Sequence, residues 1–336
     1  MSHSDATLPA ILIVGTGGTI AGAAASGTTA IYQSGVLDVE TLADACPGIE
    51  QLARLSFRSV LNKDSADITQ DDWNLIIAAV LQAINDPSID GVVITHGTDT
   101  LEETAFLLDL VVPAGKPVVL VGAMRPATSL SPDGPMNLYD AVTVAGCPTS
   151  AGRGVLVVMN NQIHMARHVT KTNTSRLDTF ASPSFAAVGA VSNGTVRYVW
   201  SGAETASQAG VPFEWSGTRL PEVLIWYGHA DSSGTLADIL LDSGRLQGIV
   251  IAGMGDGNIP ASLCGMLARA RSLGVVVVRS TRVGSGSVTP DYNNLDSTYG
   301  LISARALNPQ KARILLMLAL TLGRDINEIK RLFDRY

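Results

Sequence analysis

Short uninterrupted runs of aliphatic residues recur along the whole chain, and most are rich in β-branched side chains. Strands with one solvated face alternate polar and apolar positions, whereas strands covered on both faces appear as continuous apolar runs. The runs here are of the second kind, so they predict parallel strands between layers of helices. They lie at residues 11–14, 92–94, 118–121, 155–158, 223–226, 249–251 and 275–278.

Helical patterns fill the gaps between these runs. One begins near Asp71 and repeats apolar residues at helical spacing through Ala83. Another covers residues 101–110 and carries two glutamates in its first turn, where the helix dipole favours them. The last covers residues 308–322, with Pro309 near its first turn. Strands that alternate with helices indicate an α/β fold with right-handed crossover connections.

The composition changes between about residues 201 and 221, where small residues and two prolines replace the periodic pattern. We therefore expect an N-terminal domain at 1–202, a linker at 203–221 and a C-terminal domain at 222–336. The predicted fold class is α/β with two domains. The larger N-terminal domain has a mostly parallel sheet flanked by helices, and the smaller C-terminal domain is built on a parallel sheet of its own.

The composition also excludes several classes of protein. Hydrophobic residues make up 46% of the 336 residues and charged residues 16%, which excludes a disordered chain. The net charge of −7, without a Lys/Arg cluster, argues against a nucleic-acid partner. The longest apolar run, residues 314–322, is too short to span a membrane, so no membrane partner is expected.

The cysteines and the first residues bear on the compartment. Cys46, Cys147 and Cys264 are widely spaced and form no CxxC pair, which is typical of small buried side chains in a reducing compartment. The first ten residues, MSHSDATLPA, have neither a basic start nor an apolar core, so they do not resemble a signal peptide. We expect a cytoplasmic protein, or a periplasmic one if a signal peptide was removed.

Polar, glycine-bearing turns follow three of the predicted strands. They are 15–22, 95–100 and 122–126. Ligands bind at the carboxyl ends of the strands in open α/β sheets, so these turns should converge on one site. The first turn is not a dinucleotide motif, because GxGxxG from Gly15 would need glycine at Ile20. It is not a P-loop either, because Ala23 stands where the lysine belongs.

Thr19 and Thr98 are the candidate nucleophiles in these turns. Each lies a few residues beyond a buried strand, beside glycines that let a substrate approach the backbone. A threonine hydroxyl needs an adjacent base to attack, and Lys171 could act as that base if burial lowers its pKa. Asp99 could bind an ammonium group. The alternatives are ordinary ones, since such threonines and aspartates often cap helices and lysines are usually solvated.

The histidines favour structural roles. His164 and His168 have the i,i+4 spacing of metal ligands on a helix, but no acidic or cysteine ligand accompanies them. We expect polar or capping roles for both, and no metal site. For His96, which follows a buried strand, packing and hydrogen bonding to the backbone are favoured over catalysis. No Ser-His or Cys-His arrangement is evident.

Several motifs span nearly the whole chain and keep their order. The two threonine motifs are Thr16–Gly22 and Thr95–Thr100. The others are 116–119, 122–126, 133–139, 154–160, 169–174, 255–258 and 307–313. Together they closely resemble the motifs of bacterial L-asparaginases. The Lys-Thr-Asn-Thr segment and the extent of the match indicate the type II (glutaminase-asparaginase) branch.

The resemblance implies hydrolysis of L-asparagine to L-aspartate and ammonia by double displacement, with an acyl-enzyme on Thr19 and no cofactor. Tyr32, on a mobile segment from Ala23 to Gly35, would close over the substrate and assist Thr19. The two alternatives are a broader glutaminase-asparaginase and a non-catalytic amino-acid binding protein on the same scaffold. The second is disfavoured because both threonines and Lys171 are present.

The resemblance also assigns a second triad and the substrate contacts. Thr98, Asp99 and Lys171 would polarise the site and position water. The Thr98 N–H would help to stabilise the oxyanion, and the Ala123 carbonyl would receive the leaving amide. Asp99 would take the α-ammonium and Ser65 the α-carboxylate. The implied substrate-binding set is Ser65, Gly97, Thr98, Asp99, Ala123 and Asn258, with Asn258 donated by a neighbour in a homotetramer of intimate dimers.

Two positions depart from the family pattern. Ala66 stands where the family usually carries Gln or Glu, and Asn293 stands where a neighbouring subunit offers Glu. Losing these groups should weaken binding of the α-ammonium by ~1–3 kcal/mol if they are buried. Asp291 or Asp296 could substitute after a loop shift. The preference for asparagine over glutamine therefore stays open.

Overall fold

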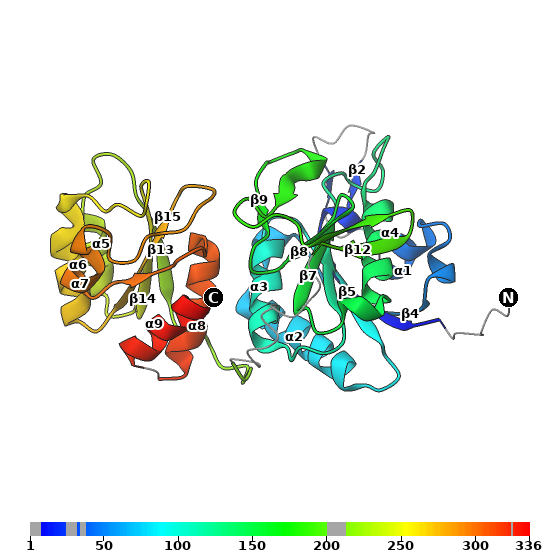
Figure 1. Ribbon diagram of the computed structural model, residues 1–336, viewed down its shortest axis with the longest axis horizontal. Coiled ribbons are helices and arrows are strands. Elements are labelled where there is room, and N and C mark those ends of the chain that lie inside the picture. Colours follow the sequence, from blue (N-terminus) through cyan, green and yellow to red (C-terminus); the bar gives the residue numbers. More distant parts are fainter. Residues whose placement is uncertain (1–7, 25–31, 34–37, 200–212, 324) are drawn as a thin grey trace. The chain divides into compact units, whose positions relative to one another are not determined.

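The computed structural model describes residues 8–24, 32–33, 38–199, 213–323 and 325–336. The chain divides into two compact units, residues 1–217 and 218–336. Each unit is built on its own central sheet (Figure 1). Residues 203–212 of the expected linker lie outside the described residues, so the linker stays a prediction.

Unit 1 contains an eight-stranded sheet in the order β12-β11-β8-β7-β6-β5-β1-β4. Its strands are β1 (Ala10–Gly17), β4 (Arg54–Lys63), β5 (Gly91–Thr95), β6 (Val118–Val121), β7 (Val155–Met159), β8 (Gln162–Met165), β11 (Gly189–Ser192) and β12 (Thr195–Tyr198). All pairs from β4 to β7 are parallel, and the pairs from β7 to β12 are antiparallel. The predicted larger, mostly parallel sheet is confirmed.

Two short antiparallel pairs accompany this sheet. One joins β2 (Ala23–Ala24) to β3 (Tyr32–Gln33), and the other joins β9 (Thr170–Lys171) to β10 (Phe180–Ala181). The central strands β1, β5, β6 and β7 are buried at every position, as their continuous apolar runs predict. Three of these strands, β1, β5 and β6, carry the turns that build the site at their carboxyl ends.

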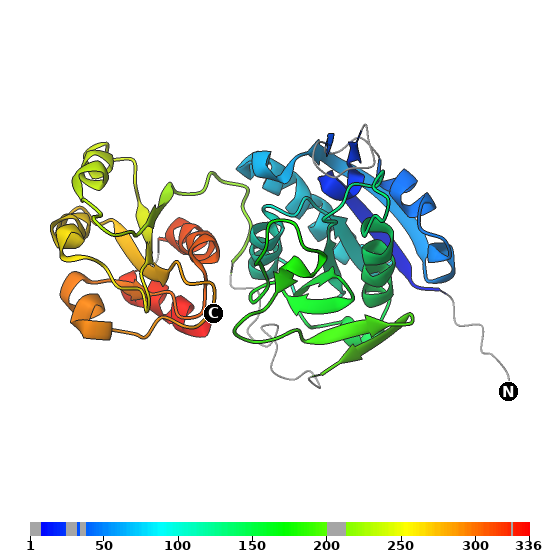
Figure 2. The same ribbon diagram turned by 90° about the horizontal axis from the view of Figure 1, so that it is seen from above.

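Helices cover both faces of the unit 1 sheet (Figures 1 and 2). They are α1 (Val39–Asp44), α2 (Gln70–Asn85), α3 (Leu101–Val111) and α4 (Gly134–Ala145). On one face α2 packs on α3, where Trp73 Nε1 donates to Thr104 Oγ1 at 3.1 Å. On the other face the end of α1 meets α4, where the Cys46 thiol donates to the Pro135 carbonyl at 3.1 Å.

The crossover connections do not all have the same hand. The strands β5, β6 and β7 follow one another in one direction across the sheet, yet the helices between them, α3 and α4, lie on opposite faces (Figure 1). One of these two connections is therefore left-handed, and the prediction of uniformly right-handed crossovers is wrong. Asn137 on α4 links the ends of both strands, because its Nδ2 donates to the Gly122 carbonyl after β6 and its Oδ1 accepts from the Asn160 N–H after β7.

Unit 2 contains a four-stranded parallel sheet in the order β13-β14-β15-β16, which confirms the predicted smaller parallel sheet. Its strands are β13 (Val223–Tyr227), β14 (Gly248–Gly253), β15 (Val276–Thr281) and β16 (Ile302–Ser303). Its helices are α5 (Thr235–Asp242), α6 (Cys264–Ser272), α7 (Leu295–Tyr299), α8 (Pro309–Thr321) and α9 (Ile326–Arg335). Among the described residues, none of the helices has the length and hydropathy of a bilayer-spanning segment.

Candidate active site

The turns after β1 and β5 meet through two glycines. Gly18 has a φ of 80°, and a Cβ built on it would lie 2.3 Å from the Cα of Gly97. No side chain fits there, so glycine is required at this position for the two turns to touch. Thr19, which begins a 3-10 turn (Thr19–Ala21), follows Gly18 directly, and Thr98 follows Gly97. Both threonines are buried, at 6% and 5% exposure.

Lys171 comes to the Thr98 turn from a distant part of the sequence. Its Nζ lies 3.0 Å from Thr98 Oγ1 and 2.6 Å from Asp99 Oδ1. The lysine side chain is 19% exposed, whereas that of Asp99 is 58% exposed. A cavity of about 350 Å³ opens beside this trio, and its lining consists of Asp99, Lys171, Thr172, Asn173 and Thr174. The three residues of the predicted second triad are therefore brought together.

Glu102 holds the main chain of Lys171. It lies in the first turn of α3 and is only 4% exposed, and its Oε2 accepts from the Lys171 N–H at 2.7 Å. The sequence offered one signal, a glutamate in the first helical turn. That position is usually solvated and stabilised by the helix dipole, so the burial of Glu102 was not foreseen.

Ser65 lies against the turn that carries Thr98 and Asp99. Its Oγ accepts from the Asp99 N–H at 3.1 Å, and its carbonyl accepts from Thr100 Oγ1 at 2.7 Å. A Cβ on Gly97 would lie 2.6 Å from Ser65 Oγ, so this approach also requires glycine. The acceptor role leaves the Ser65 O–H available to donate to a ligand. Thr100, which fixes Ser65, was not singled out from the sequence.

Two polar residues of α4 and its N-cap shape the turn that contains Ala123. Asp133 accepts from the backbone N–H groups of Met124 and Arg125, both at 2.9 Å. Asn137 Nδ2 donates to the Gly122 carbonyl at 3.0 Å. The side chain of Ala123 is fully buried in this turn. Both polar residues belong to a motif that the sequence flagged without a role, and the structure supplies one.

His96 is fully buried behind the Thr98 turn. Its Nδ1 lies 2.7 Å from the Gly97 carbonyl, which can only accept, so Nδ1 carries the proton. Burial lowers the pKa of His96 to about 4 and keeps the ring neutral near pH 7. The backbone hydrogen bond agrees with the structural role that the sequence favoured.

His164 and His168 do not share a helix. His164 lies in β8, with its Nδ1 3.0 Å from Ser182 Oγ, and His168 lies in a turn and stacks on Phe185 with ring centres 3.8 Å apart. The helical placement suggested by their i,i+4 spacing is wrong, because β8 ends at Met165 and a turn follows it. Within the described part of the chain, no three His, Cys, Asp or Glu side chains are grouped as metal ligands.

The two remaining predicted site residues are Tyr32 and Asn258. The backbone of Tyr32 pairs with Ala24, but its side chain is outside the described residues, as is most of the segment from Ala23 to Gly35. Asn258 belongs to unit 2, where it closes a tight turn through two backbone hydrogen bonds with Met254, of 2.6 and 3.0 Å.

A buried arginine organises the unit 2 segments that carry Asn258 and Asn293. Arg279 on β15 is fully buried and pairs through Nε and a terminal nitrogen with both carboxylate oxygens of Asp296, at 2.7 and 2.8 Å. It also donates to the carbonyls of Asp256 and Thr289, at 3.0 and 2.8 Å. Asp296 is therefore engaged with Arg279 and is not available as a substitute carboxylate.

The positions that depart from the family pattern are solvent-facing. Ala66 is exposed, and its N–H donates to Asp64 Oδ1 at 3.0 Å. Asn293 is also exposed and has a φ of 55°. Asp291 Oδ1 accepts from the Ser297 N–H at 2.8 Å, and this hydrogen bond holds the pKa of Asp291 below its usual value.

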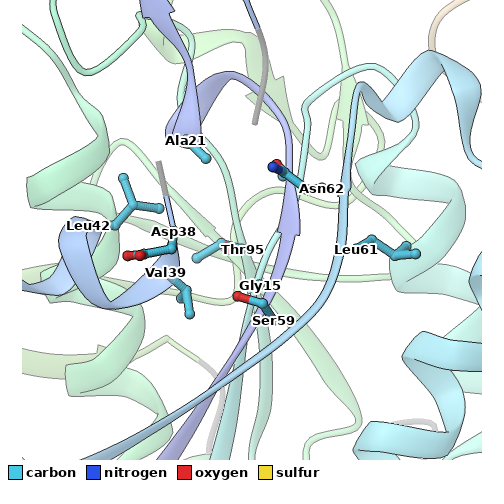
Figure 3. Close-up of a pocket in the computed structure, with 10 residues that line it drawn as sticks. Gly15, Ala21, Asp38, Val39, Leu42, Ser59, Leu61, Asn62 and Thr95 are labelled. Carbon is cyan, nitrogen blue, oxygen red and sulfur yellow. The ribbon is translucent and has the colours of Figure 1, made fainter. Parts of the chain in front are cut away.

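A second cavity, of about 320 Å³, lies near the carboxyl ends of β1 and β4 and the start of α1 (Figure 3). It is lined by Gly15, Gly17, Ala21, Asp38, Val39, Leu42, Ser59, Leu61, Asn62 and Thr95. None of the predicted catalytic or substrate-binding residues lines it, whereas two of them, Asp99 and Lys171, line the first cavity.

Comparison with known proteins covers both units. A family model described as "Asparaginase, N-terminal" matches residues 10–203, and one described as "Glutaminase/Asparaginase C-terminal domain" matches residues 222–333. L-asparaginase 2 of Escherichia coli is 46% identical over 336 residues, which cover 100% of this chain and 95% of that protein. A probable periplasmic L-asparaginase of Haemophilus influenzae is 45% identical over 98% of this chain and 94% of its own.

A more distant relative and a solved structure are also similar to this chain over nearly its whole length. The glutaminase-asparaginase of Pseudomonas fluorescens is 38% identical, over 97% of this chain and 90% of that protein. The crystal structure of a probable cytoplasmic L-asparaginase from Campylobacter jejuni is similar to this fold, with a TM-score of 0.92 and 41% identity. The match covers 98% of this chain and all of that one. The two threonine turns and both sheets thus lie within matched regions, and the chain belongs to the asparaginase family of amide hydrolases.

Proposed function

We propose that this chain hydrolyses L-asparagine to L-aspartate and ammonia, with Thr19 as the nucleophile and an acyl-enzyme as the intermediate. The observation that carries the proposal is the hydrogen-bonded trio of Thr98, Asp99 and Lys171. The turn that contains Thr98 and Asp99 packs directly on the turn that contains Thr19. Similarity to several proteins named L-asparaginase supports asparagine as the substrate.

In the first step, the Thr19 hydroxyl oxygen attacks the side-chain amide carbon, and its proton passes to the departing nitrogen with assistance from Tyr32. Negative charge develops on the former carbonyl oxygen, to which the Thr98 N–H donates. Breakage of the C–N bond releases ammonia beside the Ala123 carbonyl. An aspartyl ester on Thr19 remains.

In the second step, water attacks the ester carbon. Thr98 Oγ1 orients this water, and Lys171 Nζ, which lies 3.0 Å from that oxygen, takes part in moving its proton. The proton returns to the Thr19 oxygen as aspartate leaves. Asp99 holds the lysine Nζ in place through Oδ1, and its other oxygen remains to accept from the substrate α-ammonium. The Ser65 O–H binds the α-carboxylate, and Gly97 leaves room for both groups.

The assembly and the compartment belong to the proposal as well. We expect a homotetramer of intimate dimers, in which Asn258 of a neighbouring subunit completes each site, and analytical ultracentrifugation tests this. Ala66 and Asn293 should weaken binding of the α-ammonium. We place the protein in the cytoplasm. The Campylobacter jejuni neighbour is titled cytoplasmic, whereas the Haemophilus influenzae relative is named periplasmic.

Ammonia release from L-asparagine and L-glutamine over a concentration series tests the function. We expect Thr19→Ala to lose roughly 10³-fold or more of kcat, because removing a nucleophile leaves only binding and oxyanion stabilisation. Thr143→Ala is the matched control, since the Thr143 hydroxyl bonds only locally to the Tyr139 carbonyl on α4. Mass spectrometry after an acid quench should find the aspartyl ester on the peptide that contains Thr19.

Three outcomes separate the alternatives. Efficient release from asparagine and little from glutamine supports the proposal. Comparable rates on both amides would identify a glutaminase-asparaginase. Wild-type turnover by Thr19→Ala would overturn the assignment of the nucleophile, and ammonia from neither amide would overturn the proposed substrate.

A further inference from the structure

The position of the Lys171 ammonium depends on how its main chain is anchored. Lys171 lies in β9, which has only two residues and pairs with the two residues of β10. So short a ladder is weak on its own. Further hydrogen bonds hold this hairpin to itself, since Thr172 bonds to the Thr179 carbonyl and Asn173 N–H donates to Thr179 Oγ1. These bonds do not tie the hairpin to the turn that carries Thr98 or to α3, which follows it.

Glu102 supplies such a tie. Its Oε2 accepts from the Lys171 N–H at 2.7 Å, and Glu102 as a whole is 4% exposed. A hydrogen bond to an ionised acceptor is shorter and stronger than a neutral one, and exclusion of water strengthens it further. Glu102 lies three residues after Asp99, at the start of α3. The segment from Thr98 to Glu102 therefore holds Lys171 at two places. Glu102 accepts from its backbone N–H, and Thr98 and Asp99 accept from its Nζ.

We infer that Glu102 is a positioning residue for the hydrolytic step. It sets the main chain of Lys171 so that Nζ reaches Thr98 Oγ1 and Asp99 Oδ1 together. A shift of about 1 Å at the lysine backbone would break the hydrogen bond to one of these partners, and misplacement of that size is costly to catalysis. The inference rests on the proposed function, in which Lys171 and Thr98 act on the attacking water.

A double-mutant cycle on the full-length protein tests this role. Glu102→Gln keeps the length of the side chain but replaces the ionised acceptor by a neutral one. We expect it to lower kcat for L-asparagine by about 10-fold or more, with little change in KM, as for other residues that orient a catalytic group. Glu103→Gln is the matched control, because it changes a neighbouring, half-buried glutamate of the same helical turn. It should keep wild-type kcat.

The second arm of the cycle uses Lys171→Met. If Glu102 acts through Lys171, then Glu102→Gln should cause little further loss of kcat in the Lys171→Met background. Urea midpoints of all four proteins show whether a variant has merely lost its fold. Should Glu102→Gln unfold, Glu102→Met, which is apolar and of similar length, replaces it in the cycle.

The outcomes distinguish the inference from the proposal beneath it. Wild-type kcat in Lys171→Met would overturn the assigned triad itself. If Lys171→Met is impaired, wild-type kcat in Glu102→Gln would overturn the positioning role and leave the triad in place. If the losses of kcat in the two single variants multiply in the double variant, Glu102 acts independently of Lys171. That result would also overturn the positioning role and leave the triad in place. Non-additive losses with preserved urea midpoints support the inference.

Discussion

Two buried titratable side chains of unit 1 respond to pH in opposite ways. Asp140 on α4 is 3% exposed and accepts from Asn161 Nδ2 at 2.8 Å, and burial raises its pKa to about 6. His96 is fully buried, and burial lowers its pKa to about 4. The native state thus holds the Asp140 proton more tightly than the unfolded chain, and the His96 proton less tightly.

The signs follow from proton linkage. The Asp140 contribution is fully present below the unfolded pKa of an aspartate, near 4, and is lost as pH rises through about 6. The His96 contribution is fully present above the unfolded pKa of a histidine, near 6.5, and is lost as pH falls through about 4. The two terms oppose each other between pH 4 and 6.5, so the wild-type protein should show a flattened pH dependence there.

Asp140→Asn should remove the Asp140 contribution to the pH dependence of stability and leave that of His96. The variant has no carboxylate to desolvate, so its stability relative to wild type should increase by up to about 3 kcal/mol between pH 4 and pH 7. Urea unfolding at pH 4, 5.5 and 7 measures the change. Asp44→Asn, at an exposed position, is the control and should show no such trend. The same stability difference at all three pH values would contradict the raised pKa.

At the scale of elements, a strand's position in the sheet decided whether the sequence could predict it. The strands β1 and β5 lie inside the sheet and carry continuous aliphatic runs, so both were predicted. The strand β4 lies at the edge, has mostly exposed or half-buried positions and contains three basic residues. It lacks the buried pattern and was missed. Short strands such as β9 give too few residues for any period to appear.

The candidate site divides in a similar way. Thr19 and Thr98 were predicted from their residues, because turns at the carboxyl ends of neighbouring parallel strands must converge. Lys171 lies 73 residues beyond Thr98, and no local pattern brings the two together. The sequence offered Lys171 only as a possible base, and the family resemblance assigned it to a triad with Thr98 and Asp99. Glu102 was missed because a glutamate in a first helical turn gives no sign of being buried.

The contact between the Thr19 and Thr98 turns can be tested with Gly18→Ala. The added methyl group would lie 2.3 Å from the Gly97 Cα, so one turn must move. We expect kcat for L-asparagine to fall by roughly 10²-fold or more, because displacements near 1 Å already cost that much. Gly48→Ala is the control, since Gly48 also has a left-handed φ, of 84°, but a Cβ there meets no atom within 4 Å.

Gly18→Ala combines steric overlap with a side chain at φ 80° and ψ −172°, whereas Gly48→Ala places a side chain in the left-handed region without overlap. Gly48→Ala should lose about 1 kcal/mol of stability, because alanine is strained at a left-handed φ, and it should keep its activity. A Gly18→Ala variant with wild-type kcat would show that the two threonine turns do not need their close contact.

At the scale of the whole molecule, each compact unit has its own buried charged side chains that a substitution can alter. Arg279 and Asp296 form a buried ion pair within unit 2. Asp296→Asn leaves the arginine without a counter-charge and should destabilise unit 2 by about 3–5 kcal/mol. Calorimetry should show a lower unfolding temperature for a transition that Asp140→Asn in unit 1 does not shift.

The matched control for that prediction is an exposed pair in the same unit. Asp334→Asn removes the partner of Arg305, and both side chains of that pair are more than one third exposed. It should cost less than about 1 kcal/mol, because solvent screens surface ion pairs. Equal effects of the two substitutions would contradict the special role of the buried pair.

The hydrogen bond from Cys46 to the Pro135 carbonyl has a consequence for spectroscopy. Burial raises the pKa of that thiol to about 11, so it should resist alkylating reagents near neutral pH. Of the three cysteines, the other two are half-buried, Cys147 in unit 1 and Cys264 in unit 2. The native chain should therefore accept one spin label or fluorophore in each unit, and the distance between the labels would measure how far apart Cys147 and Cys264 lie in solution.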